Sequence, residues 1–471
     1  MRQLINGILM EHRHNNQLVK RIAKLVQDNK ELIQELRKLR DANEKLLKKN
    51  EEYEAIVIKD PNYKEIKGKV TEKLVSSKFN MVTVLYAQIH GFSEISPDMD
   101  SEALIDQLDH LYYHFDEIVK NYKIEKIRTI GDTYMCAGGI PKKNITNPVE
   151  VVLAANELIQ LVNSYSNDHN AVWGICIAVH TGSVNAAVNG KNKHSYDIKG
   201  ETVNIASRME SLGDNGKLLV SVMTKELTKE FFDCDYFGKL PVKYKGNLDI
   251  YEVKGIKAEL SVDGLGLIPN QLFKTQFALI QFHDLQEEVF DLLEKELPDD
   301  LYYHNLKHTI DVVTGVELIG WAEGISDEDI LLLKTAALFH DSGHTVSYDS
   351  HEFQGTQLAR KMLPAYNYAP ENIEVICELI MATKMPPNPQ NLLEEIICDA
   401  DLDYLGRTDF IPVSNTLFEE LKNRKMISCI NDWNKTQLKF ISNHQYYTKT
   451  ARNLREVNKQ IQIERIRQLI T

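Results

Sequence analysis

The sequence predicts a multidomain chain: an N-terminal parallel coiled coil, a central α+β domain with a ferredoxin-like order of elements, and an all-α C-terminal domain. A heptad repeat in residues 1–60, strand-like runs between long helical stretches in 78–256, and helical apolar spacing in 289–410 carry this prediction. Residues 257–288 are expected to form a linker and a helix, and residues 411–471 a helical extension.

The composition is that of a folded chain, and its 471 residues correspond to about three domains. The net charge of −13 argues against nucleic acid and anionic membranes as partners. No apolar run is long enough to span a membrane, and the N-terminus shows no signal peptide. The six cysteines form no CxxC pair and are expected to be reduced core residues. We therefore expect a cytoplasmic protein.

The first unit is defined by apolar residues that recur every seven positions. Such a repeat keeps one seam of a helix facing a partner helix, and asparagines in the second series favour parallel two-stranded pairing. We expect a homodimer through this arm; the alternative is a long amphipathic helix packed on its own chain. The first series is Leu18, Leu25, Leu32, Leu39, Leu46 and Tyr53, and the asparagines are Asn29, Asn43 and Asn50.

The central unit alternates strands with helices. A buried strand is predicted over 81–92, a hairpin with its turn at Gly131-Asp132 over 123–139, and a second hairpin with its turn at Thr181-Gly182 over 173–190. Shorter elements follow, and long helices separate the strands, so that the order is β-α-β-β-α-β with additions. These further elements are helices over 102–121, 148–166 and 201–213 and a strand over 218–221.

Four motifs of this unit, in order, resemble the catalytic domain of class III nucleotidyl cyclases. They are VTVLYAQIHGFS, KIRTIGDTYM, IAVHTGSV and YDIKGETVNIASRMESLG. The resemblance covers residues 78–256 and implies a head-to-tail dimer with composite sites at its interface. In such a site one protomer supplies two aspartates for Mg²⁺ or Mn²⁺, and the other protomer contacts a nucleoside triphosphate.

The metal half of this site departs from the family pattern. Asp132 matches the second metal aspartate, whereas Gln88 stands where the first is expected. A neutral amide removes one negative charge from between two cations, so we expect a severe loss of cyclase rate without a necessary loss of nucleotide binding. Glu94 either compensates for this change or is a surface residue.

The nucleotide half retains more of the pattern. By the resemblance, Asn204 orients the ribose, Arg208 neutralises the transition-state phosphate, and Lys245 binds phosphate, with Lys243 as its rival. Arg128 and Asp197 occupy the two base-selecting positions. Because Arg128 only donates hydrogen bonds and Asp197 accepts them, the pair complements adenine first and cytosine second, whereas guanine and uracil have the opposite polarity.

Histidines and aspartates gather in the helical third of the chain. His304 and His308 are expected at i and i+4 on one helix face, an apolar helix over 331–339 ends in His340-Asp341, and His344 follows. Another apolar helix ends in CDADLDYLG, residues 398–406. Imidazole and carboxylate together indicate a divalent metal site with open positions for water.

This set resembles the HD superfamily of metal-dependent phosphohydrolases, and within it the pattern of class I cyclic-nucleotide phosphodiesterases. The resemblance implies that His308, His340, Asp341 and Asp401 bind metal (Mg, Mn, Zn or Fe), with Asp341 bridging two ions and Asp399 as the rival of Asp401. No glutamine can be assigned as the residue that holds the base in the animal phosphodiesterases. The resemblance also implies roles for three further histidines. His304 is the expected general acid, His344 orients the attacking water, and His351 is a further ligand or a helix cap. Separately, the aromatic residues around His444 indicate that this histidine is structural.

Three functions remain open from the sequence. The first is a bifunctional enzyme that makes a cyclic nucleotide and hydrolyses one, and the second is a phosphohydrolase governed by an impaired cyclase module that binds nucleotide. The third is a non-enzymatic scaffold held together by the coiled coil. Gln88 discriminates between the first two, and the His/Asp set argues against the third.

Overall fold

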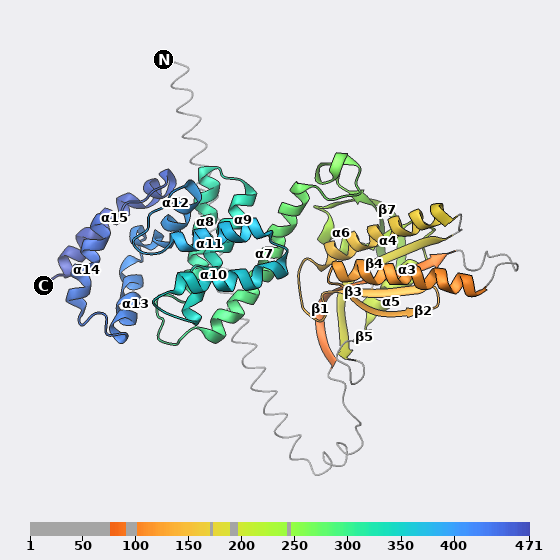
Figure 1. Ribbon diagram of the computed structural model, residues 1–471, viewed down its shortest axis with the longest axis horizontal. Helices are drawn as coiled ribbons and strands as arrows, with labels where there is room; N and C mark the ends of the chain where they lie inside the picture. The colour runs from red at the N-terminus through yellow and green to blue at the C-terminus, as the bar shows by residue number, and fades with distance from the viewer. Residues whose placement is uncertain (1–75, 91–100, 170–172, 189–195, 243–245) are drawn as a thin grey trace, which may run out of the picture. The chain divides into compact units, whose positions relative to one another are not determined.

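The computed structural model describes residues 76–90, 101–169, 173–188, 196–242 and 246–471 (Figure 1). The predicted coiled coil of residues 1–60 lies outside the described residues, and so do Glu94, Lys243 and Lys245.

The strands of the described residues form one eight-stranded sheet. Its order is β2-β3-β1-β4-β6-β8-β7, with β5 paired to β4. The four strands β2-β3-β1-β4 with helices α3 and α4 form the predicted ferredoxin-like unit, in which β1 pairs antiparallel with both β3 and β4. The elements are β1 (Ser76–His90), α3 (Ser101–Asn121), β2 (Glu125–Ile130), β3 (Thr133–Gly138), α4 (Asn147–His169), β4 (Gly174–Val188), β5 (Tyr196–Lys199), α5 (Glu201–Glu210), β6 (Leu218–Ser221), α6 (Val222–Thr228), β7 (Phe232–Val242) and β8 (Gly246–Ile256).

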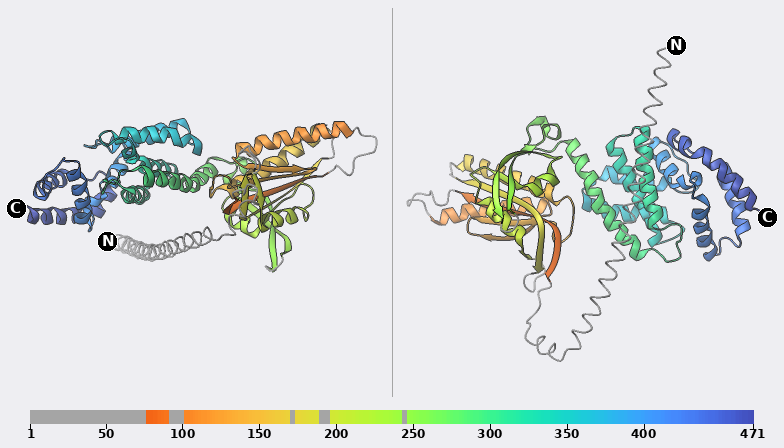
Figure 2. Two further views of the ribbon diagram at one scale, coloured as in Figure 1. Left: turned by 90° about the horizontal axis from the view of Figure 1, so that it is seen from below. Right: turned by 180° about the vertical axis from the view of Figure 1, so that it is seen from behind.

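Both faces of the central strands are buried, because alternate residues of a strand point to opposite faces. Leu85 and Ile89 of β1 belong to the core cluster under α3 and α4, whereas Val84 and Tyr86 belong to the cluster beneath α5. Figures 1 and 2 show α3 and α4 running side by side over one face of the sheet. The apolar run read as a buried strand is thereby confirmed.

The second predicted hairpin is wrong. β4 runs without interruption from Gly174 to Val188, and Gly182 lies inside the strand. A Cβ atom at Gly182 would stand 2.6 Å from Thr202 Oγ1 of α5, so this glycine allows a helix to approach the sheet and does not form a turn. The predicted turn at Gly131-Asp132 is present, with Gly131 at a φ of 59°.

The remainder of the chain is helical, as predicted, and its helices enclose a second apolar core. Helix α7 contributes to both cores: Phe273 packs with Phe231 and Phe232 of the sheet domain, and Phe282, Leu285, Val289 and Leu293 pack in the helical domain. The α-helices are α7 (Gln271–Glu296), α8 (Leu306–Glu323), α9 (Asp327–Phe339), α10 (His351–Met362), α11 (Pro370–Ala382), α12 (Leu392–Asp401), α13 (Phe410–Asn423), α14 (Ile430–Asn443) and α15 (Lys449–Leu469). The 3₁₀ helices are η1 (Ala258–Leu260), η2 (Val262–Gly264), η3 (Ser342–Thr345), η4 (Leu363–Tyr366) and η5 (Asp403–Gly406).

Among the described residues, no helix has the length and apolar character needed to cross a membrane. All six cysteines are free thiols. The expectation that they are core residues is wrong for Cys429, which is exposed, and only partly met by Cys234, which is half-buried.

Candidate active sites

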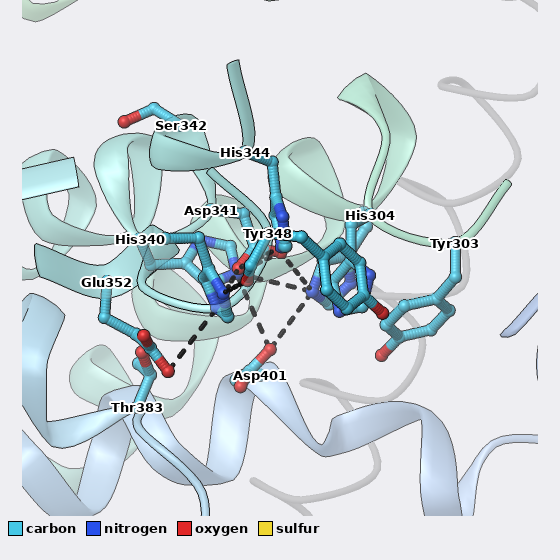
Figure 3. Close-up of polar contacts among 12 residues, drawn as sticks. Tyr303, His304, His340, Asp341, Ser342, His344, Tyr348, Glu352, Thr383 and Asp401 are labelled. Carbon is cyan, nitrogen blue, oxygen red and sulfur yellow. Dashed lines mark hydrogen bonds and ion pairs between the residues drawn. The ribbon is translucent and has the colours of Figure 1, made fainter. Parts of the chain in front are cut away.

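The helical domain brings four predicted metal ligands into one cluster. His308 Nε2 lies 3.3 Å from His340 Nε2 and 3.1 Å from Asp401 Oδ1, and Asp341 Oδ2 lies 3.4 Å from His308 Nε2 and 3.2 Å from His340 Nε2. In Figure 3 the side chains of His340, Asp341 and Asp401 point toward one another. Two donors held about 2.1 Å from one ion lie roughly 3.0–3.4 Å apart, so these separations fit a shared cation.

The local fold explains how the four side chains converge. Asn305 caps α8 by accepting hydrogen bonds from the amides of Lys307 and His308, which places His308 in the first turn. His340 and Asp341 follow the last residue of α9, and Asp401 ends α12. His340 Nδ1 donates to the carbonyl of Ala337 at 2.8 Å, which directs Nε2 into the cluster.

The charges in the cluster stabilise one another. Burial alone would raise the pKa of Asp401, but the imidazoles of His308 and His340 outweigh it and lower that pKa. The pKa of Asp341 also lies well below its usual range, because His340 and its neighbours outweigh burial. Both carboxylates are therefore ionised.

Asp399, the rival of Asp401, lies elsewhere. It is fully buried and accepts hydrogen bonds from the amides of Tyr447 and Thr448 at 2.9 and 2.7 Å. Burial raises its pKa to about 6. The structure thus brings Asp401 to the histidines and Asp399 to the C-terminal segment.

His304 does not lie on the helix that carries His308, and the predicted i, i+4 arrangement is wrong. The chain is not yet helical at His304 because Asn305 is the N-cap of α8. His304 still faces the cluster, since it forms a second potential metal-holding group with Asp341 and His344. His351 begins α10 and places Nε2 3.6 Å from Asp341 Oδ1, as a further ligand would, while its Nδ1 donates to the carbonyl of Tyr348.

His344 lies in the wall of the cluster. Its ring stacks on that of His351 at 4.0 Å, and neither ring nitrogen has a hydrogen-bond partner. Burial lowers its pKa to about 3, so the ring is neutral. The structural role of His444 is consistent with its surroundings, because burial lowers its pKa to about 4 and its ring packs edge-on against Tyr446.

Sequence reasoning missed Glu420, a wholly buried carboxylate on α13. Its Oε1 lies 2.5 Å from His304 Nδ1, and its Oε2 accepts from the amides of Tyr303 and His304 at 3.0 and 3.2 Å. Burial by itself would lower the pKa of His304, but Glu420 outweighs it and raises that pKa. The only mark of Glu420 in the sequence was its place between Leu417 and Leu421.

A pocket of about 560 Å³ opens from the cluster. His304, Asp341 and Asp401 line one part of it, and apolar residues of the C-terminal helices, with Gln437 and Phe440, line another. Ser414 Oγ accepts from Trp433 and lies 2.6 Å from Gln437 Oε1, which fixes the amide. Gln437 and Phe440 lie about one turn apart on α14, a spacing visible in the sequence to which no function was assigned.

In the sheet domain, Gln88 and Asp132 lie together. Gln88 Nε2 donates to Asp132 Oδ2 at 3.1 Å, and the amide of Ile89 donates to the carbonyl of Asp132 at 2.9 Å. Tyr112 holds the turn by donating to the carbonyl of Gly131. The amide therefore occupies the position beside Asp132 where a second carboxylate was expected.

The other half-site residues have different partners in the structure. Asn204 and Arg208 are exposed one turn apart on α5, and Arg208 Nη2 donates to the carbonyl of Pro241 at 2.7 Å. Arg128 is exposed on β2 with its Nη2 3.4 Å from Tyr86 Oη, and Asp197 on β5 pairs with Lys199 at 3.3 Å.

The eight-stranded sheet and the His/Asp cluster belong to two domains of different classes, a cyclase-type α+β domain and an HD-type helical domain. In particular, residues 74–255 match the family model of the adenylate and guanylate cyclase catalytic domain, and residues 305–403 match that of the HD domain. The chain thus carries both domains, and the two resemblances expected from the sequence are confirmed.

Curated relatives match the first domain. Atrial natriuretic peptide receptor 2 of Homo sapiens is 34% identical over 189 residues, which are 39% of this chain and 18% of the receptor. Retinal guanylyl cyclase 2 of Rattus norvegicus is 33% identical over 185 residues, 38% of this chain and 17% of that protein. This chain therefore spans less than a fifth of the length of these relatives.

Solved structures of cyclases match about two fifths of this chain. The guanylate cyclase domain of RhGC from Catenaria anguillulae in complex with GTP is 29% identical, with a TM-score of 0.36, over 38% of this chain and 100% of that one. The adenylyl cyclase CyaB from P. aeruginosa is 25% identical, with a TM-score of 0.37, over 41% of this chain and 100% of that one.

Proposed function

We propose that this protein hydrolyses the phosphodiester of a cyclic mononucleotide with divalent metal ions in its HD domain, under the influence of a cyclase domain that binds nucleoside triphosphate and turns over weakly. The convergence of His308, His340, Asp341 and Asp401 on one point carries the proposal. The presence of a cyclase domain in the same chain points to cyclic nucleotides as the shared chemistry.

The residues of the cluster fit divalent cations. Asp341 Oδ2 is buried without a hydrogen-bond partner, and the Nε2 atoms of His308 and His340 face each other at 3.3 Å, a separation that suits two ligands of one cation. His308, His340, Asp341 and Asp401 would hold one ion, and Asp341 with His351 would contact a second. Such ions supply positive charge that polarises a phosphate and acidifies water.

The protein's own groups supply the proton transfer. His304 is in place to donate a proton to the leaving 3′-oxygen, and Glu420 holds the Nδ1 side of the ring so that Nε2 faces the cluster. The neutral His344 is in place to orient the attacking water. Tyr348 Oη donates to Glu420 Oε1 at 3.1 Å, which further fixes that carboxylate.

The pocket beside the cluster supports a nucleotide as the substrate. It combines a flat aromatic ring, Phe440, with a fixed amide, Gln437, and one such pair can stack on a base and hydrogen-bond to its edge. Because the metal ligands line the same pocket, a phosphodiester attached to that base reaches them. A mononucleotide fits its volume of about 560 Å³.

The cyclase domain is proposed to act as a homodimer with Mg²⁺ or Mn²⁺. Arg128 and Asp197 favour ATP, with CTP second. Because one of the matched relatives is named retinal guanylyl cyclase 2, GTP is the competing substrate. Weak turnover follows from the amide of Gln88 beside Asp132. A fully active bifunctional enzyme is the main alternative, and a nucleotide-sensing scaffold would leave the His/Asp cluster without a role.

Product identification tests this proposal. The purified chain is incubated with Mn²⁺ or Mg²⁺ and each of the four nucleoside triphosphates, then with each cyclic mononucleotide, and the products are resolved by chromatography and mass spectrometry. We expect a 5′-mononucleotide from at least one cyclic nucleotide, lost when the metal is chelated and regained when it is restored. Absence of hydrolysis of every cyclic nucleotide, with metal bound, contradicts the proposal.

Glu420→Gln is expected to lower kcat for cyclic nucleotide hydrolysis about 10- to 100-fold with little change in KM. The amide keeps the size of the side chain but loses the charge that holds His304 Nδ1, and a positioned general acid contributes about 10²–10⁴-fold. A diester with a nitrophenyl leaving group needs no protonation, so its hydrolysis should fall much less.

The neighbouring Glu419→Gln is the matched control, because Glu419 is exposed and its nearest cation, Lys422, lies 3.7 Å away. It should leave both substrates unaffected. An equal loss on both substrates in Glu420→Gln would mean that this glutamate supports the fold of the site and not the acid.

A further inference from the structure

The short segment that carries Asp401 is anchored to the C-terminal part of the chain on both sides. Two residues before Asp401, Asp399 accepts from the amides of Tyr447 and Thr448. Two residues after it, Asp403 receives both arms of the Arg455 guanidinium, Nε to Oδ1 at 2.5 Å and Nη2 to Oδ2 at 2.9 Å. A fork of this kind fixes direction as well as distance.

Packing reinforces the two anchors. Tyr446 Oη donates to the carbonyl of Leu402, the residue next to Asp401, at 3.4 Å. A Cβ atom at Gly406 would stand 2.5 Å from Arg455 Cβ, so only a glycine there allows α15 to approach η5 this closely. Thr448 caps α15 through the amide of Ala451, which places the start of the helix beside Asp399.

We propose that α15 and the residues before it position Asp401 for metal binding, with Arg455 acting through Asp403 as a positioning residue. This segment lies beyond residues 305–403, so the working metal site extends past the matched HD domain. The inference rests on the proposed function, because it requires the cluster to bind a divalent cation. The physical reason is that a ligand held outside productive geometry by a fraction of an ångström loses much of its contribution.

The Mn²⁺ affinity of the Arg455→Ala variant tests this positioning role. The full-length chain carries Asp132→Ala, which removes the cyclase-site ligand, and free Mn²⁺ is measured by electron paramagnetic resonance during titration of the metal-free protein. We expect the affinity to fall about 10- to 100-fold, as when other partners of metal ligands are removed. Arg455→Lys keeps the positive charge but cannot form the two-armed contact with Asp403. Its affinity for Mn²⁺ should lie between those of the parent and of Arg455→Ala.

Arg467→Ala is the control on the same helix, because Arg467 pairs only with the exposed Glu464 in the described structure. It should bind Mn²⁺ like the parent. Should Arg455→Ala fail to fold, Asp403→Asn weakens the same fork with little change in volume. Its expected signature is a higher Mn²⁺ requirement for half-maximal hydrolysis, with kcat recovered at saturating metal.

The outcomes separate the two proposals. A parent that binds Mn²⁺ tightly, together with folded Arg455→Ala and Asp403→Asn variants of unchanged affinity, overturns the positioning role and leaves the hydrolase intact. A lower kcat at unchanged Mn²⁺ requirement also overturns it, because it reports only a smaller active fraction. A parent that binds no Mn²⁺ with Asp132 removed contradicts the proposed function itself.

Discussion

Asp341→Asn is expected to lower the hydrolysis of a cyclic nucleotide by at least about 10³-fold. The carboxylate is buried, contacts both His308 and His340, and also faces His351, so its neutral replacement weakens every proposed ion contact at once. A metal ion contributes several kcal/mol to stabilising a developing phosphate charge, and about 1.4 kcal/mol corresponds to a factor of ten in rate. Initial rates at saturating substrate and metal measure the effect.

Asp327→Asn provides the control for this change. Asp327 begins the helix that ends at Phe339, immediately before His340, but it is exposed and far along the chain from the cluster. Loss of its charge removes a favourable interaction with the helix dipole of about 0.3–1 kcal/mol and should leave the rate unchanged. Hydrolysis by Asp341→Asn at the rate of the unaltered chain would exclude the cluster as the catalytic centre.

Gln88→Asp is expected to raise the cyclisation of ATP with Mn²⁺ at least about tenfold. The change replaces the amide that donates to Asp132 with a second carboxylate, and two adjacent carboxylates disfavour each other until a divalent cation lies between them. The same change should lower the stability of the metal-free chain by about 1 kcal/mol or more, since a hydrogen bond is exchanged for like-charge repulsion. Cyclic product is quantified by mass spectrometry.

Gln88→Asn controls for the change in length, because it shortens the side chain while keeping it neutral, and it should not increase turnover. Adding Asp132→Ala to Gln88→Asp should abolish the gain. If Gln88→Asp binds nucleoside triphosphate and Mn²⁺ but cyclises no faster than the unaltered chain, Gln88 is not what limits the cyclase domain. A gain seen with GTP and not with ATP would overturn the base preference read from Arg128 and Asp197.

Much of the fold follows from local patterns in the sequence. Alternate residues of β1 are buried on opposite faces of the sheet, and Gly131 has a positive φ in its turn. Both features depend on a few adjacent residues, and both the strand and the turn were predicted. The error at Gly182 has the opposite origin. The sequence does not distinguish a glycine required for close packing of a helix from a glycine required for a turn. At Gly182 the close contact is with Thr202, which lies 20 positions away in the chain.

The site shows the same division. Motif spacing indicated His308, His340 and Asp341, which the structure brings together. The motif favoured Asp401, which stands directly before the Leu of the DL pair, with Asp399 as its rival. In the structure Asp401 lies beside His308, and Asp399 accepts from the amides of Tyr447 and Thr448. Glu420 was not foreseen, because its contact with His304 joins residues 116 positions apart and a single glutamate between two leucines does not reveal that contact.

Helix α7 bears on how this protein can be dissected. A fragment that ends before Gln271 lacks the ring of Phe273, which packs against Phe231 and Phe232. A fragment that starts after Glu296 lacks four apolar side chains of the helical core, from Phe282 to Leu293. No single cut within or beside α7 therefore leaves both apolar cores complete. Fragments of the two domains that are expressed separately should each include α7.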